Sequence, residues 1–338
     1  MTKFYANTAL ISLLSLAPQL SRSANLRPRK VSFTNNVLRI AVQTWMNNPE
    51  EATEIFGHIS EWDVSRVFNM SELFANAVNF NEDLSSWDVS NVRDMRNAFA
   101  NASSFAGDLA SWNVSSVKYT SHMFHGASSF DSDLSDWNTT NVLNFSYMFA
   151  GASSFNGDVS SFDITNSYDL SFMFLNATSF NGDVSQWTIP KQKVSGLQIK
   201  WLQNMRSMFQ GASSFNGDVS QWQTYAAHNM NSMFKNATNF SGDVSGWDVR
   251  HAKDFSEMFV GSALNQVLCW HVQEGANTSN MFSDTTASFG DDCEDETRAS
   301  PELDVTEIPA APNSAASPGL QAGVELSVAL VVFIASVL

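Results

Sequence analysis

The chain is poor in charge and in residues that break regular structure. Charged residues make up 15% of its 338 residues, against about 25% in a typical protein, and Lys and Arg contribute 18 against 34 acidic residues. The net charge of −16 argues against nucleic acid as a partner, because its phosphates would be repelled. With 8 Pro and 16 Gly, collagen-like and proline-rich fibres are excluded.

Cysteine is also scarce. Cys269 and Cys293 alone build neither a disulfide framework nor a four-thiolate zinc site, and we expect no cofactor. Aromatic residues, in contrast, are abundant, with 26 Phe and 10 Trp. They supply enough apolar surface for a core, which excludes disorder over most of the length.

The first 23 residues have the features of a secretory signal peptide. They contain Lys3, an apolar stretch from Ala9 to Ala17, and small residues at Ser21 and Ser23 where a peptidase can cut. The arginines near this end leave a transit peptide as the alternative.

The other end predicts a tether. Residues 291–319 are rich in Ser, Pro, Ala and Glu, which is typical of a solvated stalk, and residues 320–338 form an apolar tail. Small residues, a spacer and a terminal apolar segment match the signal for a GPI anchor, with candidate attachment residues Asn313, Ser314 and Ala315. A retained tail anchor and an incidental apolar tail are the alternatives.

A period of 25 residues fills residues 58–290. Two aromatic columns keep this step nearly throughout. They are Trp62, Trp87, Trp112, Trp137, Phe162, Trp187, Trp222, Trp247 and Trp270, and Phe74, Phe99, Phe124, Phe149, Phe174, Phe209, Phe234, Phe259 and Phe282. Several columns in phase over nine units predict a solenoid with one coil per unit.

Within a unit, Trp87 and Val89 alternate with polar residues, which indicates a short strand with one buried face. Val92, Met95 and Phe99 then recur at i, i+3 and i+7, as in a helical turn. We therefore predict an α/β fold, a leucine-rich-repeat-like solenoid of nine coils of about 25 residues.

A helical cap is expected before the first coil, within residues 24–57. Apolar residues follow a helical stripe from Asn35 to Met46, with Asn35 as the N-cap and Pro49 just beyond the end. Such a helix would cover the apolar surface that a repeat array exposes at its first coil.

Several motifs fall in phase from unit to unit. Examples are the segments 153–160 and 87–92, followed by an adjacent Met-Phe pair such as Met148 and Phe149. In this combination the chain resembles the BspA-like leucine-rich-repeat surface proteins over about residues 58–290. The resemblance implies a secreted or surface-displayed protein with a role in adhesion or interaction.

The chain departs from this pattern in three places. Phe162 replaces Trp, ten extra residues follow Trp187, and the last unit is shortened. The insertion at residues 188–200 is either a tolerated loop or a binding loop, since insertions in repeat arrays gather on one face. It holds the basic cluster Lys191, Lys193 and Lys200.

Cys269 and Cys293 stand 24 residues apart, almost one period. Equivalent positions on stacked coils approach to about 5 Å, which suits a disulfide. We predict that this bond closes the last coil, with two free thiols as the alternative.

Two groups of polar residues are weighed as sites. A column of carboxylates is expected to accept backbone N–H groups at turns, with a row of calcium sites as the alternative: Asp83, Asp108, Asp133, Asp158, Asp183, Asp218 and Asp243. His122 and His125 are expected to be surface imidazoles, since no third metal ligand stands at a motif spacing. No nucleophile elbow, phosphate loop or paired catalytic carboxylate breaks the repeat, so we predict no enzymatic activity.

The candidate binding surface follows from the alternation at Trp87. If Trp87 and Val89 face inward, their polar neighbours face outward, and the same offset selects a set that we call the polar strip. The strip comprises Ser86, Asp88, Ser111, Asn113, Asp136, Asn138, Ser161, Asp163, Gln186, Gln221 and Asp248.

Nine N-glycosylation sequons occur, some of which the repeat bias alone would generate. They begin at Asn69, Asn101, Asn113, Asn138, Asn144, Asn176, Asn236, Asn239 and Asn277.

Together these features predict a non-enzymatic repeat protein on the extracellular face of the plasma membrane, reached by the secretory pathway and held by the C-terminal tail or its lipid replacement. Its expected work is adhesion or protein recognition, with a cell-surface or extracellular protein or glycan as partner. A structural wall or matrix component that binds polysaccharide is the alternative, and a glycan hydrolase is the weakest one.

Overall fold

The computed structural model describes residues 32–188 and 203–290, all of which belong to one unit, Met1–Asp292. The second unit, Cys293–Leu338, lies outside the described residues. The predicted signal peptide, stalk, apolar tail and lipid-anchor residues lie outside them as well, as does the insertion beyond Thr188. Among the described residues, no helix is both long and apolar enough to span a membrane.

Regular elements are short in the described ranges. The helices are α3 (Asn35–Asn47) and α4 (Pro49–Phe56), followed by the 3-10 turns η1 (Ile59–Glu61) and η2 (Thr224–Ala226). The strands are β1 (Gln203–Asn204), β2 (Ala227–Asn229), β3 (Val267–Leu268) and β4 (Ser288–Phe289). β1 pairs in parallel with β2, and β3 with β4.

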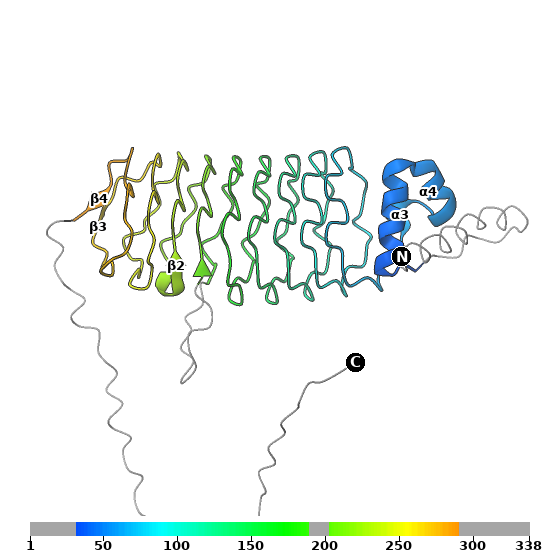
Figure 1. Ribbon diagram of the computed structural model, residues 1–338, viewed down its shortest axis with the longest axis horizontal. Helices are drawn as coiled ribbons and strands as arrows, with labels where there is room; N and C mark the ends of the chain where they lie inside the picture. Colours follow the sequence, from blue (N-terminus) through cyan, green and yellow to red (C-terminus); the bar gives the residue numbers. More distant parts are fainter. Residues whose placement is uncertain (1–31, 189–202, 291–338) are drawn as a thin grey trace, which may run out of the picture. The chain divides into compact units, whose positions relative to one another are not determined.

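After the helices the chain forms coils that lie side by side (Figure 1). Parallel bridges and the β1–β2 pair join one residue of each coil to the equivalent residue of the next. We call this assembly the coil stack. Its bridged positions are Asn69, Asp94, Tyr119, Asn144, Asp169, Asn204, Asn229, Asp254 and Asn277.

Alternate backbone N–H groups connect each coil to the next. Met95, Asn97, Phe99 and Asn101 donate to the carbonyl groups of Tyr119, Ser121, Met123 and His125, over 2.6 to 3.1 Å. We call residues 93–101 and their equivalents the ladder half of the coil, and residues 81–91 and their equivalents the turn half.

The ladder half differs from the predicted helical turn. Val92, Met95 and Phe99 are buried, as their spacing requires, but no helix runs through them. Asn97 and Asn101 have φ values of 55° and 57°, a left-handed conformation that interrupts a right-handed helix. The burial of these three residues therefore comes from coil-on-coil packing.

The predicted strand at Trp87 and Val89 also differs from the structure, because no strand is formed there. The alternation that suggested it is present: Trp87 and Val89 are buried, while Ser86 and Asp88 are exposed. Bridges between coils form in the ladder half instead.

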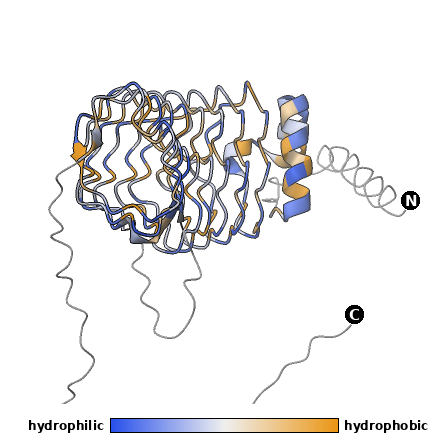
Figure 2. Cartoon of the chain, turned by 60° about the vertical axis from the view of Figure 1, so that its left-hand side comes forward, coloured by the Kyte–Doolittle hydropathy of each residue, from blue (hydrophilic) through white to orange (hydrophobic). Residues whose placement is uncertain are grey.

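Aromatic rings fill the interior. In the column Phe80, Phe105, Phe130, Phe155, Phe180, Phe215 and Phe240, successive ring centroids lie 5.8 to 6.0 Å apart. Figure 2 shows apolar and polar residues alternating along the coils that enclose them.

Most indole rings of the Trp column add a hydrogen bond to the stacking contacts. The indole N–H of Trp87 donates to the Ile59 carbonyl of the preceding turn at 2.9 Å, which satisfies a buried donor. Equivalent bonds are made by Trp112, Trp137, Trp187, Trp222, Trp247 and Trp270. Phe162 stacks at 6.4 Å from Trp137 and 6.2 Å from Trp187, but it has no donor to offer.

α3 covers the first coil, at the place where the sequence predicts a capping helix. Its buried face joins the core of the coil stack, with the Trp45 and Trp62 ring centroids 6.0 Å apart. The backbone N–H of Phe33 also donates to the Asp63 carbonyl at 3.0 Å. The helix therefore makes the apolar contacts with the coil, and the residue before its N-cap makes the backbone pairing.

One detail predicted for this cap is wrong. Thr34 is the N-cap residue, and the Asn35 side-chain oxygen instead accepts from the backbone N–H groups of Phe68 and Asn69, at 3.0 and 3.2 Å. Pro49 lies just beyond the end of α3, as predicted, and begins α4, where its missing N–H leaves no intrahelical bond unmade.

The last coil is closed by the β3–β4 pair. Phe289 lies edge-on to Phe282, with ring centroids 5.1 Å apart, and Ala287 is buried. Cys269 is disulfide-bonded, and Cys293, its predicted partner, lies outside the described residues.

Candidate binding surface

The polar strip lies on the outside of the coil stack. Nine of its eleven residues are exposed, and Asp163 and Asp248 are half-buried. The exposed members are Ser86, Asp88, Ser111, Asn113, Asp136, Asn138, Ser161, Gln186 and Gln221.

Much of the strip already makes hydrogen bonds within the stack. The Ser86 hydroxyl donates to the Ser60 carbonyl, and the Ser111 hydroxyl donates to the Ser85 carbonyl at 2.8 Å. Asp88 and Asn113 accept from the backbone N–H two residues further on, each at 3.1 Å. These groups fix the turn, so they have less capacity left for a ligand.

The half-buried carboxylates are engaged as well. Asp248 pairs with Arg250 at 2.7 Å, and the hydrogen bond from Arg250 is the main cause that lowers the pKa of Asp248. For Asp163, burial raises the pKa, but hydrogen bonds from Thr165 and Thr140 outweigh it and leave the pKa lowered. Both side chains are structural parts of their coils.

The pattern changes at two neighbouring coils. Thr188 and Gln223 occupy the position that is Asp or Asn at residues 63, 88, 113, 138, 163 and 248. A Thr hydroxyl supports this turn more weakly than a carboxylate or an Asn amide, and the Gln side chain is one methylene longer than that of Asn. The chain leaves the repeat after Thr188 and enters η2 after Gln223. The regular surface is interrupted between these coils.

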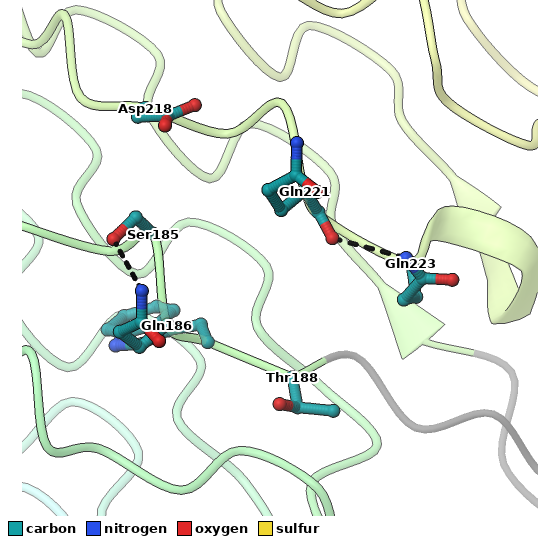
Figure 3. Close-up of a pocket in the computed structure, with 7 residues that line it drawn as sticks. Ser185, Gln186, Thr188, Asp218, Gln221 and Gln223 are labelled. Carbon is teal, nitrogen blue, oxygen red and sulfur yellow. Dashed lines mark hydrogen bonds between the residues drawn. The ribbon is translucent and has the colours of Figure 1, made fainter.

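A hollow of about 310 Å³ lies at this interruption (Figure 3). We call it the glutamine hollow. It is lined by Ser185, Gln186, Trp187, Thr188, Asp218, Gln221 and Gln223. Two of these residues, Gln186 and Gln221, belong to the polar strip, so the sequence selected part of the site without indicating that the two coils form a hollow.

The carboxylates of the turns are stabilised by the backbone. Each member of the column Asp83, Asp108, Asp133, Asp158, Asp183, Asp218 and Asp243 accepts from the N–H two residues on, at 2.8 to 2.9 Å. The predicted turn bonding is confirmed.

These bonds affect the ionisation of the column. The backbone N–H groups of Ser135, Ser220 and Ser245 are the main cause that lowers the pKa of Asp133, Asp218 and Asp243. For Asp83 the main cause is the Ser85 hydroxyl. The surface of the turn half is therefore negatively charged at neutral pH.

An aromatic row on the ladder half was not anticipated from the sequence. The rings of His122, Tyr147 and Phe172 stack at 4.5 and 4.4 Å, and the Arg206 guanidinium lies 5.5 Å from the centroid of Phe172. The three ring-bearing residues occupy one column with φ of 58° to 59°. Because each ring covers its neighbour's face, the row offers few free faces for stacking a ligand.

The histidine pair sits at one end of this row. The His122 and His125 ring centroids are 5.7 Å apart, and the His125 Nδ1 is buried without a hydrogen-bond partner. Within residues 32–188 and 203–290, no group of three or more His, Cys, Asp or Glu side chains is placed to hold a metal ion.

The sequons are spread over the stack. Asn69 and Asn144 are half-buried, and the other seven asparagines are exposed: Asn101, Asn113, Asn138, Asn176, Asn236, Asn239 and Asn277.

Family comparison places this chain in a group defined by its repeat. The family described as "Mycoplasma protein of unknown function, DUF285" matches residues 43–141, 111–198 and 189–295, which together exceed half of the chain. The chain belongs to this family. No curated protein and no solved structure matches it significantly.

Proposed function

We propose that the protein is a non-enzymatic, cell-surface recognition protein that binds a partner along the polar strip. The observation that carries the proposal is the exposure of nine of the eleven strip residues on the outside of a regularly stacked scaffold. A flat polar surface without exposed aromatic anchors gives low affinity per coil, so several coils would act together.

The proposal includes the fold class and the finer family resemblance. We infer a leucine-rich-repeat-like solenoid, related to the BspA-like surface proteins. The 25-residue step of the parallel bridges supports this inference, as does the in-phase packing of the aromatic columns. A secreted protein that is tethered to the extracellular face of the plasma membrane is consistent with this class.

Catalysis is a poor fit to the described geometry. Side chains fill the interior of the stack, and the glutamine hollow carries one carboxylate, Asp218, where glycan hydrolysis needs two. The described surface therefore has the groups needed to bind a partner but lacks the second carboxylate needed for glycan hydrolysis.

An array of cell-surface proteins and glycans, probed with the full-length protein, identifies the partner. Replacing Asp136, Gln186 and Gln221 by Lys, singly and together, is expected to weaken that binding stepwise while circular dichroism stays unchanged. Gln43→Lys, on an exposed position of α3, is the matched control for the glutamine changes. Deleting the insertion after Thr188 is expected to have little effect. Loss of binding only on that deletion would contradict the proposal, and bulk association with insoluble polysaccharide would favour a wall component.

A further inference from the structure

The glutamine hollow and the rest of the polar strip differ in the side-chain atoms that remain available to a ligand. Each of its three glutamines donates one of its two side-chain N–H groups within its own coil. Gln186 Nε2 donates to the Ser185 hydroxyl at 3.2 Å, Gln221 Nε2 to the Ser220 hydroxyl at 3.3 Å, and Gln223 Nε2 to the Gln221 carbonyl at 3.3 Å. Figure 3 shows the first and the last of these bonds.

The atoms left over are mainly acceptors. Each glutamine keeps one N–H and the two lone pairs of Oε1, and Asp218 adds a carboxylate that is ionised at neutral pH, so acceptors outnumber donors. No Lys or Arg of the described residues lines the hollow. A ligand that supplies hydrogen-bond donors and positive charge is therefore complementary to it, whereas an anion would be repelled.

The size and composition of the hollow restrict the class of cation. Its volume of about 310 Å³ is some ten times the roughly 30 Å³ of one water, so it admits a side chain and not merely an ion. Calcium prefers six to eight oxygens, usually with several carboxylates, and this hollow offers one. A neutral sugar can use the remaining glutamine N–H groups, but it supplies no positive charge to Asp218.

We propose that the glutamine hollow binds the positively charged side chain of a partner protein, a lysine ammonium or an arginine guanidinium. Asp218 forms the ion pair, and the Oε1 atoms of Gln186, Gln221 and Gln223 accept the remaining N–H groups. The inference rests on the proposed function only in taking the polar strip as a recognition surface. It names one anchor point on that surface.

The test uses the full-length protein and small probes, read by saturation-transfer NMR on the probe. N-acetyl-argininamide and N-acetyl-lysinamide are expected to bind saturably and to be displaced by salt, while N-acetyl-alaninamide does not bind. Asp218→Asn is expected to weaken cation binding roughly two- to fivefold, as for an exposed ion pair. Gln221→Glu is expected to strengthen it by a similar factor.

Asp133→Asn is the matched control. Asp133 lies in the same column as Asp218, with the same turn hydrogen bond and a pKa lowered by the same cause, but outside the hollow. Equal loss in both variants would mean diffuse attraction to an acidic surface and would overturn the proposal. Tighter binding of maltotriose or of calcium chloride than of the two cationic probes would also overturn the proposal. Because these probes report on the hollow alone, their failure leaves the stepwise strip test of the proposed function standing.

Discussion

The two halves of each coil hold the stack together by different means. In the ladder half, backbone groups make the coil-to-coil hydrogen bonds, so the surface side chains are free to vary: Glu72, Asn97, His122, Tyr147 and Phe172 share one column. In the turn half, side chains make most of these bonds, as with Asn91 Nδ2 to the Ser65 carbonyl at 2.8 Å. The identity of surface residues is therefore more constrained in the turn half, whereas in the ladder half the residues that recur in the sequence are buried ones such as Phe99.

The largest expected effect comes from adding a methyl group in the turn half. A Cβ at Gly157 would lie 2.0 Å from the carbonyl oxygen of Ser132, a backbone atom that cannot move without shifting the preceding coil. Gly157→Ala is expected to destabilise the protein by about 1–3 kcal/mol or more, measured as a lowered thermal midpoint. Gly246→Ala is the control, because no atom lies within 4 Å of its Cβ position. Equal midpoints for the two variants would show that the turn half is looser than its contacts indicate.

A smaller effect is expected when one indole donor is removed. Trp112→Phe keeps the ring in its column but leaves the Leu84 carbonyl without the 3.0 Å bond from Trp112 Nε1. Because the Leu84 carbonyl still accepts from the Trp87 backbone N–H at 3.0 Å, the expected cost is about 0.5–1.5 kcal/mol in the free energy of unfolding, measured by denaturant titration. Phe162→Trp is the reciprocal variant, since it supplies a donor where the column lacks one, and it is expected to be neutral or stabilising. A stabilised Trp112→Phe protein would refute this account of the Trp column.

The same contrast explains what the sequence predicts well. Period-2 alternation around Trp87 depends only on one buried face, so the exposure of Ser86 and Asp88 followed from it without knowledge of the strand. The capping helix α3 was predictable because its apolar stripe is local. The ladder was misread as a helical turn, because spacing at Val92 and Met95 cannot reveal that backbone N–H groups donate to the next coil.

The glutamine hollow could not be predicted from the sequence for a related reason. Gln186 and Gln221 were selected as strip residues, but they are 35 residues apart, and their joint surface depends on how two coils meet beside an insertion. The aromatic row was missed because the left-handed column that carries Tyr147 and Phe172 is defined by coil stacking and not by a local motif.

The smallest expected effect concerns pH in the ladder half. Burial, together with the neighbouring His125, lowers the pKa of His122 below its ordinary value of 6.5. Above pH 6.5 the ring is neutral in both folded and unfolded chains, so its contribution to stability is fully present there. As the pH falls below 6.5 the unfolded chain binds the proton first, and this contribution is lost as the pH passes through the folded-state pKa.

His122→Phe keeps the stacking on Tyr147 but cannot titrate, and Phe172 shows that the column accepts this ring. The thermal midpoint of the wild type should therefore fall more than that of His122→Phe between about pH 8 and pH 5. The difference should be small because the imidazole is half-buried, and parallel curves would show that His122 is not the titrating group.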